Sequence, residues 1–277
     1  RKDNPTTLKQ FIILLIALAT PFLGGAQQRP KIIAFYTAKN DLAHISFVKE
    51  ALPWFENQAE EVGYEFYSTS DWKEMNGENL AKYQLVVFLD TRPEITDQRE
   101  AFESYMKNGG AWMGFHFSAF ALTPSDFPQD WNWYHEVFLG SGQYASNTWR
   151  PTSATLKVEQ PLHEIFEGIS ATLKAAPNEW YRWEHDLRTN PDIQILASID
   201  PSSFPLGTGP KAHEIWREGY YPVIWTNKNY RMIYFNMGHN DMDYDGGTNE
   251  TLSSTFESPD QERVFINSLK WLLESKK

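Results

Sequence analysis

The sequence predicts an α/β domain with a mainly parallel central sheet, helices on both faces of that sheet, and a decorated second half. In the first half, short apolar segments rich in β-branched residues alternate with amphipathic segments of helical period. Strands are expected over 31–37, 64–68, 84–89 and 111–116, and helices over 41–61 and 96–107. Because parallel strands need long crossover connections, which helices usually supply, this alternation predicts the fold class.

End signals support both helices. Apolar residues recur at three- and four-residue steps through the first helix, and Asn40 or Asp41 can cap it. Pro53 is expected to kink or split this helix, because proline lacks a backbone N–H. The second helix, Thr96 to Lys107, should end at the glycine pair 109–110.

The second half is less regular, but it also contains strand and helix patterns. Strands are expected over 152–158, 193–199, 222–226 and 231–235, helices over 130–139 and 261–273, and a loop over 201–210. The turn Asn227-Lys228-Asn229 predicts a hairpin between the last two strands. No Pro/Ser-rich linker divides the chain, so a single domain over 27–277 is expected.

Composition excludes several functions. The 277 residues carry a net charge of −11 and contain no cysteine. The negative charge disfavours a nucleic-acid partner, since backbone phosphates require a basic surface. Without cysteine there is no disulfide, thiolate nucleophile, cysteine-bound zinc or iron–sulfur cluster. The sequence also has no G-x-S-x-G elbow, dinucleotide-binding G-x-G-x-x-G or phosphate-binding loop at the expected positions.

Residues 1–26 have the pattern of a secretory signal peptide. Lys9 precedes an apolar run over 11–19, and small residues follow at 24–26. We therefore expect a periplasmic or secreted bacterial protein with no stable membrane insertion after cleavage. An uncleaved N-terminal anchor is the alternative interpretation.

Polar residues follow three of the expected parallel strands. Ligands bind beyond the carboxyl ends of strands in open α/β sheets, so these positions predict a binding site. The candidate substrate-binding residues there are Tyr36, Asn40, His44, Asp90, Arg92 and Ser118. Polar residues at strand ends can also be ordinary caps of the helices that follow.

Three titratable residues are the candidate catalytic groups. Gly114 allows a tight turn that would present His116 at the end of its strand, and His239 follows Gly238 in the same way. Glu179 lies among aromatic residues, whose desolvating effect should raise its pKa into the range useful for acid–base chemistry. Purely structural roles are the alternative for each residue.

A cofactor is not required by these residues, but a divalent metal ion is an alternative. His116, Glu179 and His239 offer nitrogen and oxygen ligands suited to Zn²⁺. The segment Asp241–Gly246 matches the opening of a calcium loop, although Leu252 stands where the final bidentate glutamate belongs. That segment is otherwise a solvated acidic loop.

Aromatic residues cluster in two segments, 131–134 and 180–183. Sugars present apolar C–H faces that pack on aromatic rings, so Trp133, Trp180 and Tyr181 are candidate sugar-binding residues. Packing in the hydrophobic core is the alternative.

These motifs together resemble the ThuA-like family, named for trehalose utilisation, from about Lys31 to Leu273. The segments that carry the resemblance are 109–116 (GGAWMGFH), 161–162 (PL), 178–181 (NEWY), 222–225 (PVIW), 231–235 (RMIYF) and 238–239 (GH). The resemblance implies a flavodoxin-like, class I glutamine amidotransferase-like fold without the amidotransferase cysteine. His44 lies farther from the first strand than the histidine of many relatives, which leaves its role open.

The resemblance also implies a role in the metabolism of disaccharides and their keto derivatives. The sequence thus predicts an exported enzyme that acts on a disaccharide or keto-sugar by His/Glu acid–base chemistry. A non-catalytic carbohydrate-binding protein and a metal-dependent hydrolase are the alternatives.

Overall fold

The computed structural model describes residues 28–122, 131–148, 151–203, 219–239 and 253–274. The expected signal peptide and the acidic segment Asp241–Gly246 lie outside the described residues, as does most of the expected loop over 201–210. Among the described residues, no helix has the length and apolar character needed to cross a bilayer.

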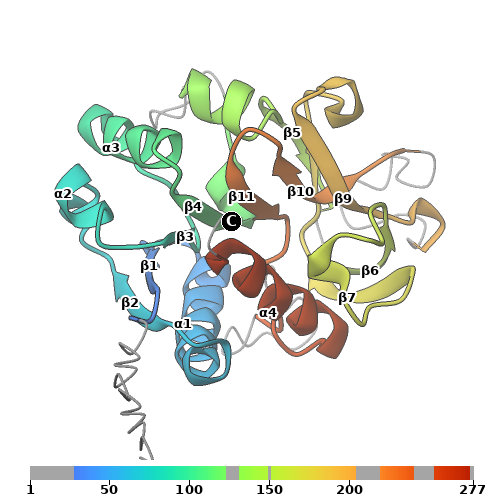
Figure 1. The fold of residues 1–277 in the computed structure, drawn as a ribbon. Coiled ribbons are helices and arrows are strands. Elements are labelled where there is room, and N and C mark those ends of the chain that lie inside the picture. The colour runs from blue at the N-terminus through green and yellow to red at the C-terminus, as the bar shows by residue number, and fades with distance from the viewer. Residues whose placement is uncertain (1–27, 123–130, 149–150, 204–218, 240–252, 275–277) are drawn as a thin grey trace, which may run out of the picture.

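The described strands form a nine-stranded sheet in the order β2-β1-β3-β4-β11-β10-β9-β6-β7 (Figure 1). Its parallel half contains β2 (Glu65–Thr69), β1 (Lys31–Phe35), β3 (Leu85–Phe88), β4 (Ala111–Phe115) and β11 (Arg231–Phe235). The antiparallel half adds β10 (Pro222–Asn227), β9 (Ile193–Ile199), β6 (Thr152–Val158) and β7 (Thr172–Asn178). The α/β prediction is confirmed.

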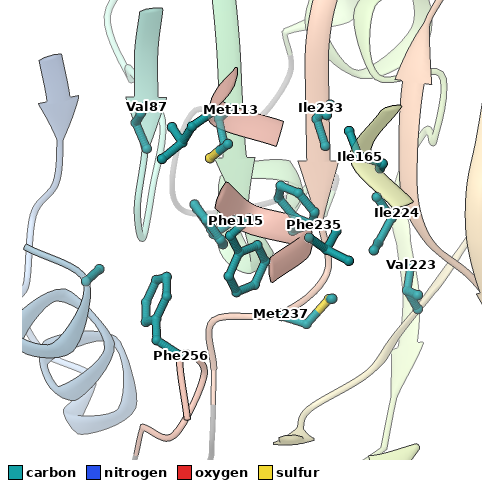
Figure 2. Packing of buried hydrophobic residues seen from close by; sticks show 14 of the residues in the cluster. Val87, Met113, Phe115, Ile165, Val223, Ile224, Ile233, Phe235, Met237 and Phe256 are labelled. Carbon is teal, nitrogen blue, oxygen red and sulfur yellow. The ribbon is translucent and has the colours of Figure 1, made fainter. Parts of the chain in front are cut away.

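Helices cover both faces of the parallel half. α1 (Leu42–Val62) and α4 (Pro259–Leu273) pack on one face, and α3 (Thr96–Lys107) packs on the other, near the short α2 (Gly77–Leu80) (Figure 1). Successive residues of a strand point to opposite faces, so Ile32 enters the α1/α4 core and Ile33 the α3 core. Figure 2 shows part of the α1/α4 core, where the ring of Phe115 packs against those of Phe235 and Phe256.

α1 differs from the expected helix because it runs through Pro53 without a break. Pro53 is exposed, so water can hydrogen-bond the carbonyl that proline leaves without a partner. The neighbouring side chains of Trp54 and Phe55 are buried and hold this turn on the sheet. Asp41 caps the helix, accepting from the backbone N–H groups of Ala43 and His44 at 2.8 and 3.4 Å.

The second half contains structure that the sequence pattern did not reveal. The helix expected over 130–139 is a π-helix over Trp133–Phe138. Strand β7, which contains Pro177, was not expected. A separate two-stranded sheet, β5 (Tyr144–Asn147) and β8 (Tyr181–Trp183), lies beside the carboxyl edge of the parallel strands and contributes to the cavity described below.

Candidate functional site

Loops that follow the parallel strands meet the β7–β8 connection at a cavity of about 550 Å³. A second cavity of about 320 Å³ shares four of its lining residues, Asn40, Asp41, His44 and Phe117. The two cavities therefore adjoin at the loop after β1 and the turn after β4. Cavities of this size are typical of small-molecule sites.

Backbone strain is concentrated at this edge. In the described part of the chain, the non-glycine residues with positive φ are Ala38 (50°), Asn40 (68°) and His116 (37°). The first two lie in the loop after β1, and His116 follows β4 directly. Strained backbone of this kind costs about 1–3 kcal/mol for each residue and is often found at functional sites.

His116 is held in one tautomer by its surroundings. Its Nδ1 lies 3.0 Å from the backbone carbonyl of Asn236, which can only accept a hydrogen bond, so Nδ1 carries the hydrogen. The neutral ring therefore directs the lone pair of Nε2 toward the Glu179 carboxylate, 3.4 Å away. His116 is 1% exposed, and within the described residues Nε2 makes no hydrogen bond. Burial lowers the pKa of His116.

Glu179 and His239 are brought together by the connection between β7 and β8. The Glu179 N–H donates to the His239 carbonyl at 2.9 Å. The amide oxygen of Asn178 accepts from the N–H groups of Gly238 and His239 at 3.2 and 3.0 Å. These backbone contacts set the Glu179 carboxylate 2.8 Å from Nδ1 of His239.

His239 lies between two carboxylates, because its Nε2 is 3.5 Å from Asp41. Burial lowers its pKa, but the hydrogen bonds and charges of Asp41 and Glu179 outweigh burial and raise it to about 9. His239 is thus an imidazolium at neutral pH, and it holds the pKa of Asp41 well below its usual range. His44, whose ring centroid is 4.7 Å from that of His239, has a pKa lowered to about 3, mainly by burial.

The expected direction of the Glu179 pKa is wrong. Burial does raise it, as its aromatic neighbours suggested, but the hydrogen bond and the charge of the protonated His239 outweigh burial, so the pKa of Glu179 lies below its ordinary value. Glu179 is therefore an ionised carboxylate in contact with two imidazole rings. The sequence could not reveal this, because both histidines come from other strands.

The cavity walls are largely aromatic. The rings of Phe117, Phe120, Tyr144 and Tyr181 line the larger cavity, beside the polar side chains of Asn40 and Asn147. The Tyr181 ring also packs on His116, with centroids 4.1 Å apart. Phe117, Phe120 and Tyr144 were not among the expected site residues, and Tyr144 lies on the unpredicted strand β5.

Asp90 and Arg92 line the smaller cavity. Asp90 is held by hydrogen bonds, whereas Arg92 lies against an aromatic ring. The Asp90 carboxylate accepts from the N–H groups of Thr37 and Ala38 at 2.8 and 2.6 Å, which fixes the loop after β1. Burial raises the pKa of Asp90 to about 6. Arg92 is 6% exposed, and its guanidinium lies 5.7 Å from the centre of the Phe117 ring.

Four expected substrate-binding residues do not line either cavity. Trp180 is fully buried in the core, where its indole N–H donates to the Thr152 carbonyl. Trp133 packs on Phe138 in the α3 core. Ser118 is fully buried, and Tyr36 packs partly buried against the α1/α4 core. Some large aromatic residues of this chain pack in the core and others line the cavity. The sequence alone did not show which residues belong to which group.

Two overlapping groups could hold a metal ion. They are His116, Glu179 and His239, and Asp41, His44 and His239. Within each group, the possible ligand atoms all lie within 4.8 Å of one another. His239 belongs to both groups, through different ring nitrogens.

Comparison with known proteins identifies the family. The model of the ThuA family, described as trehalose utilisation, matches residues 32–272. A ThuA-like protein from Bacteroides uniformis has a similar structure, with a TM-score of 0.79 and 31% identity over 93% of this chain and 97% of its own. One from Parabacteroides merdae shares the fold at a TM-score of 0.60 and 16% identity, covering 90% of this chain and 93% of its own. No curated protein matches. The protein belongs to the ThuA family.

Proposed function

We propose that this protein is an exported enzyme of carbohydrate metabolism that transforms a disaccharide or keto-sugar in the cavity at the carboxyl edge of the sheet. The observation that carries the proposal is the arrangement of Glu179 and His239 in that cavity, backed by His116 and flanked by aromatic rings. A buried carboxylate–imidazole pair open to a cavity of several hundred Å³ is an arrangement suited to acid–base chemistry on a bound molecule.

The walls suit a sugar better than a flat aromatic or a long apolar ligand. Phe117, Phe120, Tyr144 and Tyr181 offer ring faces for the C–H surfaces of a pyranose. Asn40 and Asn147 stand beside them to exchange hydrogen bonds with hydroxyl groups. The family's link to trehalose utilisation agrees with this chemistry.

Arg92 would bind an acceptor oxygen of the substrate. Within the described residues, its guanidinium makes no hydrogen bond or ion pair with another side chain, although it is almost fully buried and lines the smaller cavity. A guanidinium has five N–H donors and no acceptor, so it pairs with carbonyl, hydroxyl or carboxylate oxygens. A sugar that spans both cavities would bring one of its oxygens to Arg92.

In the reaction, His239 would give a proton to a sugar oxygen, and the Glu179 and Asp41 carboxylates would stabilise the ring in its charged form. The neutral ring of His44, whose centroid is 4.7 Å from that of His239, lines the same cavity. The cavity thus presents one protonated and one unprotonated imidazole to a bound ligand, which is the pairing that acid–base catalysis uses.

The test is a binding and turnover screen with the purified chain. Disaccharides and their 3-keto derivatives are tested for an increase in Tm and, by NMR, for formation of a product. Binding accompanied by product supports the enzyme. Saturable binding without product supports a carbohydrate-binding protein instead, and no binding to any sugar contradicts the proposal. Export is tested separately, by the N-terminal sequence of the protein recovered from the periplasm of an expressing bacterium.

A further inference from the structure

We propose that His116, Glu179 and His239 bind one divalent transition-metal ion of the Zn²⁺ class, with Glu179 Oε2, His116 Nε2 and His239 Nδ1 as ligands. This inference rests on the proposed function only in placing the substrate next to the ion. With the ion bound, His239 is a neutral ligand, and the ion takes the place of the His239 proton as the electrophile at the sugar oxygen. The ion would act as a Lewis acid on a sugar oxygen.

Hydrogen bonds to the two histidines orient their unprotonated ring nitrogens toward Glu179. The Asn236 carbonyl, 3.0 Å from Nδ1 of His116, fixes the ring hydrogen on that nitrogen, so the lone pair of Nε2 faces Glu179 Oε2, 3.4 Å away. Asp41, 3.5 Å from Nε2 of His239, favours a hydrogen on that nitrogen and leaves Nδ1 facing the same carboxylate oxygen. The three possible ligand atoms lie within 4.8 Å of one another, which is close enough for one cation to bind all three.

A proton provides hydrogen-bond partners for only part of the cluster. A proton on His239 gives hydrogen bonds to Glu179 and Asp41, but it leaves His116 Nε2 without a partner at 1% exposure. A buried polar atom without a partner destabilises the folded protein. A metal ion held by all three atoms removes that cost.

Each proposed histidine ligand also has a hydrogen-bond acceptor next to its second ring nitrogen. Metal-binding histidines commonly donate their second ring N–H to a backbone carbonyl or a carboxylate, which fixes the ring for coordination. The Asn236 carbonyl accepts from Nδ1 of His116, and the Asp41 carboxylate lies beside Nε2 of His239. Asp41, His44 and His239 form a second possible ligand set. None of these residues has a buried side-chain atom that needs a partner. An ion bound there would also occupy Asp41, which is the carboxylate that orients His239.

The choice of metal follows from the ligands. Two imidazoles and one carboxylate suit Zn²⁺ and related first-row ions, whereas Ca²⁺ prefers oxygen ligands alone. Three protein ligands leave at least one coordination position free. Because Glu179 and His239 line the larger cavity while His116 lies behind them, that position opens toward a bound sugar.

The test uses the purified full chain, stripped with a chelator and then supplied with Zn²⁺ or Co²⁺. We expect one Zn²⁺ per chain after gel filtration. The Co²⁺ form should show visible absorption bands and two exchangeable, paramagnetically shifted imidazole N–H resonances, one from each ligating histidine. These measurements need no variant, so they remain decisive if a substitution impairs folding. Binding of less than one ion per chain, or a Co²⁺ spectrum without imidazole signals, overturns the proposal.

Variants then assign the ligands. H116Q and E179Q should each weaken Zn²⁺ binding by at least about 100-fold, because even second-shell partners account for about 10–100-fold. The matched control is H185Q, which changes a half-exposed histidine near two other carboxylates and should leave Zn²⁺ affinity unchanged. If H44Q abolishes binding while H116Q does not, the second ligand set holds the ion and the proposal is wrong.

The outcomes separate this inference from the proposed function. If the stripped protein converts its sugar at the full rate, the metal site is wrong and the enzyme stands. If one Zn²⁺ binds as described but no sugar binds or reacts, the metal site stands and the sugar enzyme is wrong.

Discussion

The two ends of the parallel sheet carry cavities of similar size but very different chemistry. The amino end has a cavity of about 480 Å³, lined among others by Gly110, Arg231 and Glu274. The cavities at the carboxyl end measure about 550 and 320 Å³ and contain the histidine–carboxylate cluster. Size therefore does not identify the site. The carboxyl end is identified as the site because buried ionisable groups and strained backbone occur there together. Both features destabilise the folded protein, and they are typical of functional sites.

The largest difference between the two ends should appear in catalysis. Glu179→Gln keeps the size of the side chain but removes the charge that holds His239, so turnover should fall by about 10²–10⁴-fold, the usual contribution of general acid–base catalysis. Glu274→Gln, at the amino-end cavity, should leave turnover unchanged. The measurement is kcat for the sugar found in the screen, with circular dichroism to verify folding. Equal kcat values for the two variants would remove the distinction between the ends.

Asp90, at the carboxyl end, should make the free energy of unfolding depend on pH. Its pKa in the folded protein, about 6, lies above its ordinary value of 3.8, so the folded state binds the proton more tightly. Stability from this group is therefore present below pH 4 and is lost as the pH rises through 6. The shift of about two pKa units corresponds to at most about 3 kcal/mol.

Urea unfolding at several pH values from 4 to 7 tests this expectation. The free energy of unfolding of the wild type, relative to Asp90→Asn, should decrease between pH 4 and pH 6 and then level off. A difference that stays constant over this range would show that the carboxyl group is not perturbed by folding.

Substitution of one arginine at each end of the sheet should separate sugar binding from stability. Arg92→Gln should weaken sugar binding by about 10–100-fold, or about 1.4–2.8 kcal/mol, without loss of stability, since this buried cation has no ion-pair partner among the described residues. Arg231 donates to the Trp271 carbonyl and packs near its ring, so Arg231→Gln should lower Tm and leave sugar affinity unchanged. Calorimetric titration and thermal unfolding of both variants measure the two effects.

The smallest effect concerns the backbone. Ala38 at the carboxyl end and Gly109 at the amino end both have positive φ. Gly109→Ala should cost about 1 kcal/mol of stability from backbone strain alone, because a Cβ there meets no atom within 4 Å. Ala38→Gly should be nearly neutral, since relief of strain is offset by the greater freedom of glycine in the unfolded chain. Urea unfolding of both variants measures the difference, and a large loss for Ala38→Gly would argue against strain there.

The sequence predicted the parallel half of the fold well, because most of its strands are short and apolar, and β1 and β3 are each followed by a clear helical pattern. The helix from Thr96 to Lys107 was predicted with the bounds that the structure has. The helix break that was expected at Pro53 does not occur. The helix tolerates Pro53 because this residue is exposed to solvent, and the sequence does not show the exposure of a single residue. Strand β7 was missed because it contains Pro177, and a proline argues against a strand when only the sequence is known.

The candidate site was predicted in part. His116 and His239 could be found because each follows a strand of the parallel half, and Glu179 because it stands among aromatic residues. The role of Asp41 could not be found, since its contact with His239 joins residues 198 positions apart. The aromatic wall was assigned only partly, because Trp180 and Tyr181 are neighbours in the sequence but point into the core and the cavity, respectively.

The most direct test of this account is a crystal structure of Glu179→Gln soaked with the sugar found in the screen. The account predicts a sugar in the carboxyl-end cavity, against the rings of Phe117 and Tyr181, with one of its oxygens within hydrogen-bonding distance of His239. A sugar bound instead in the amino-end cavity beside Gly110 and Arg231 would contradict it.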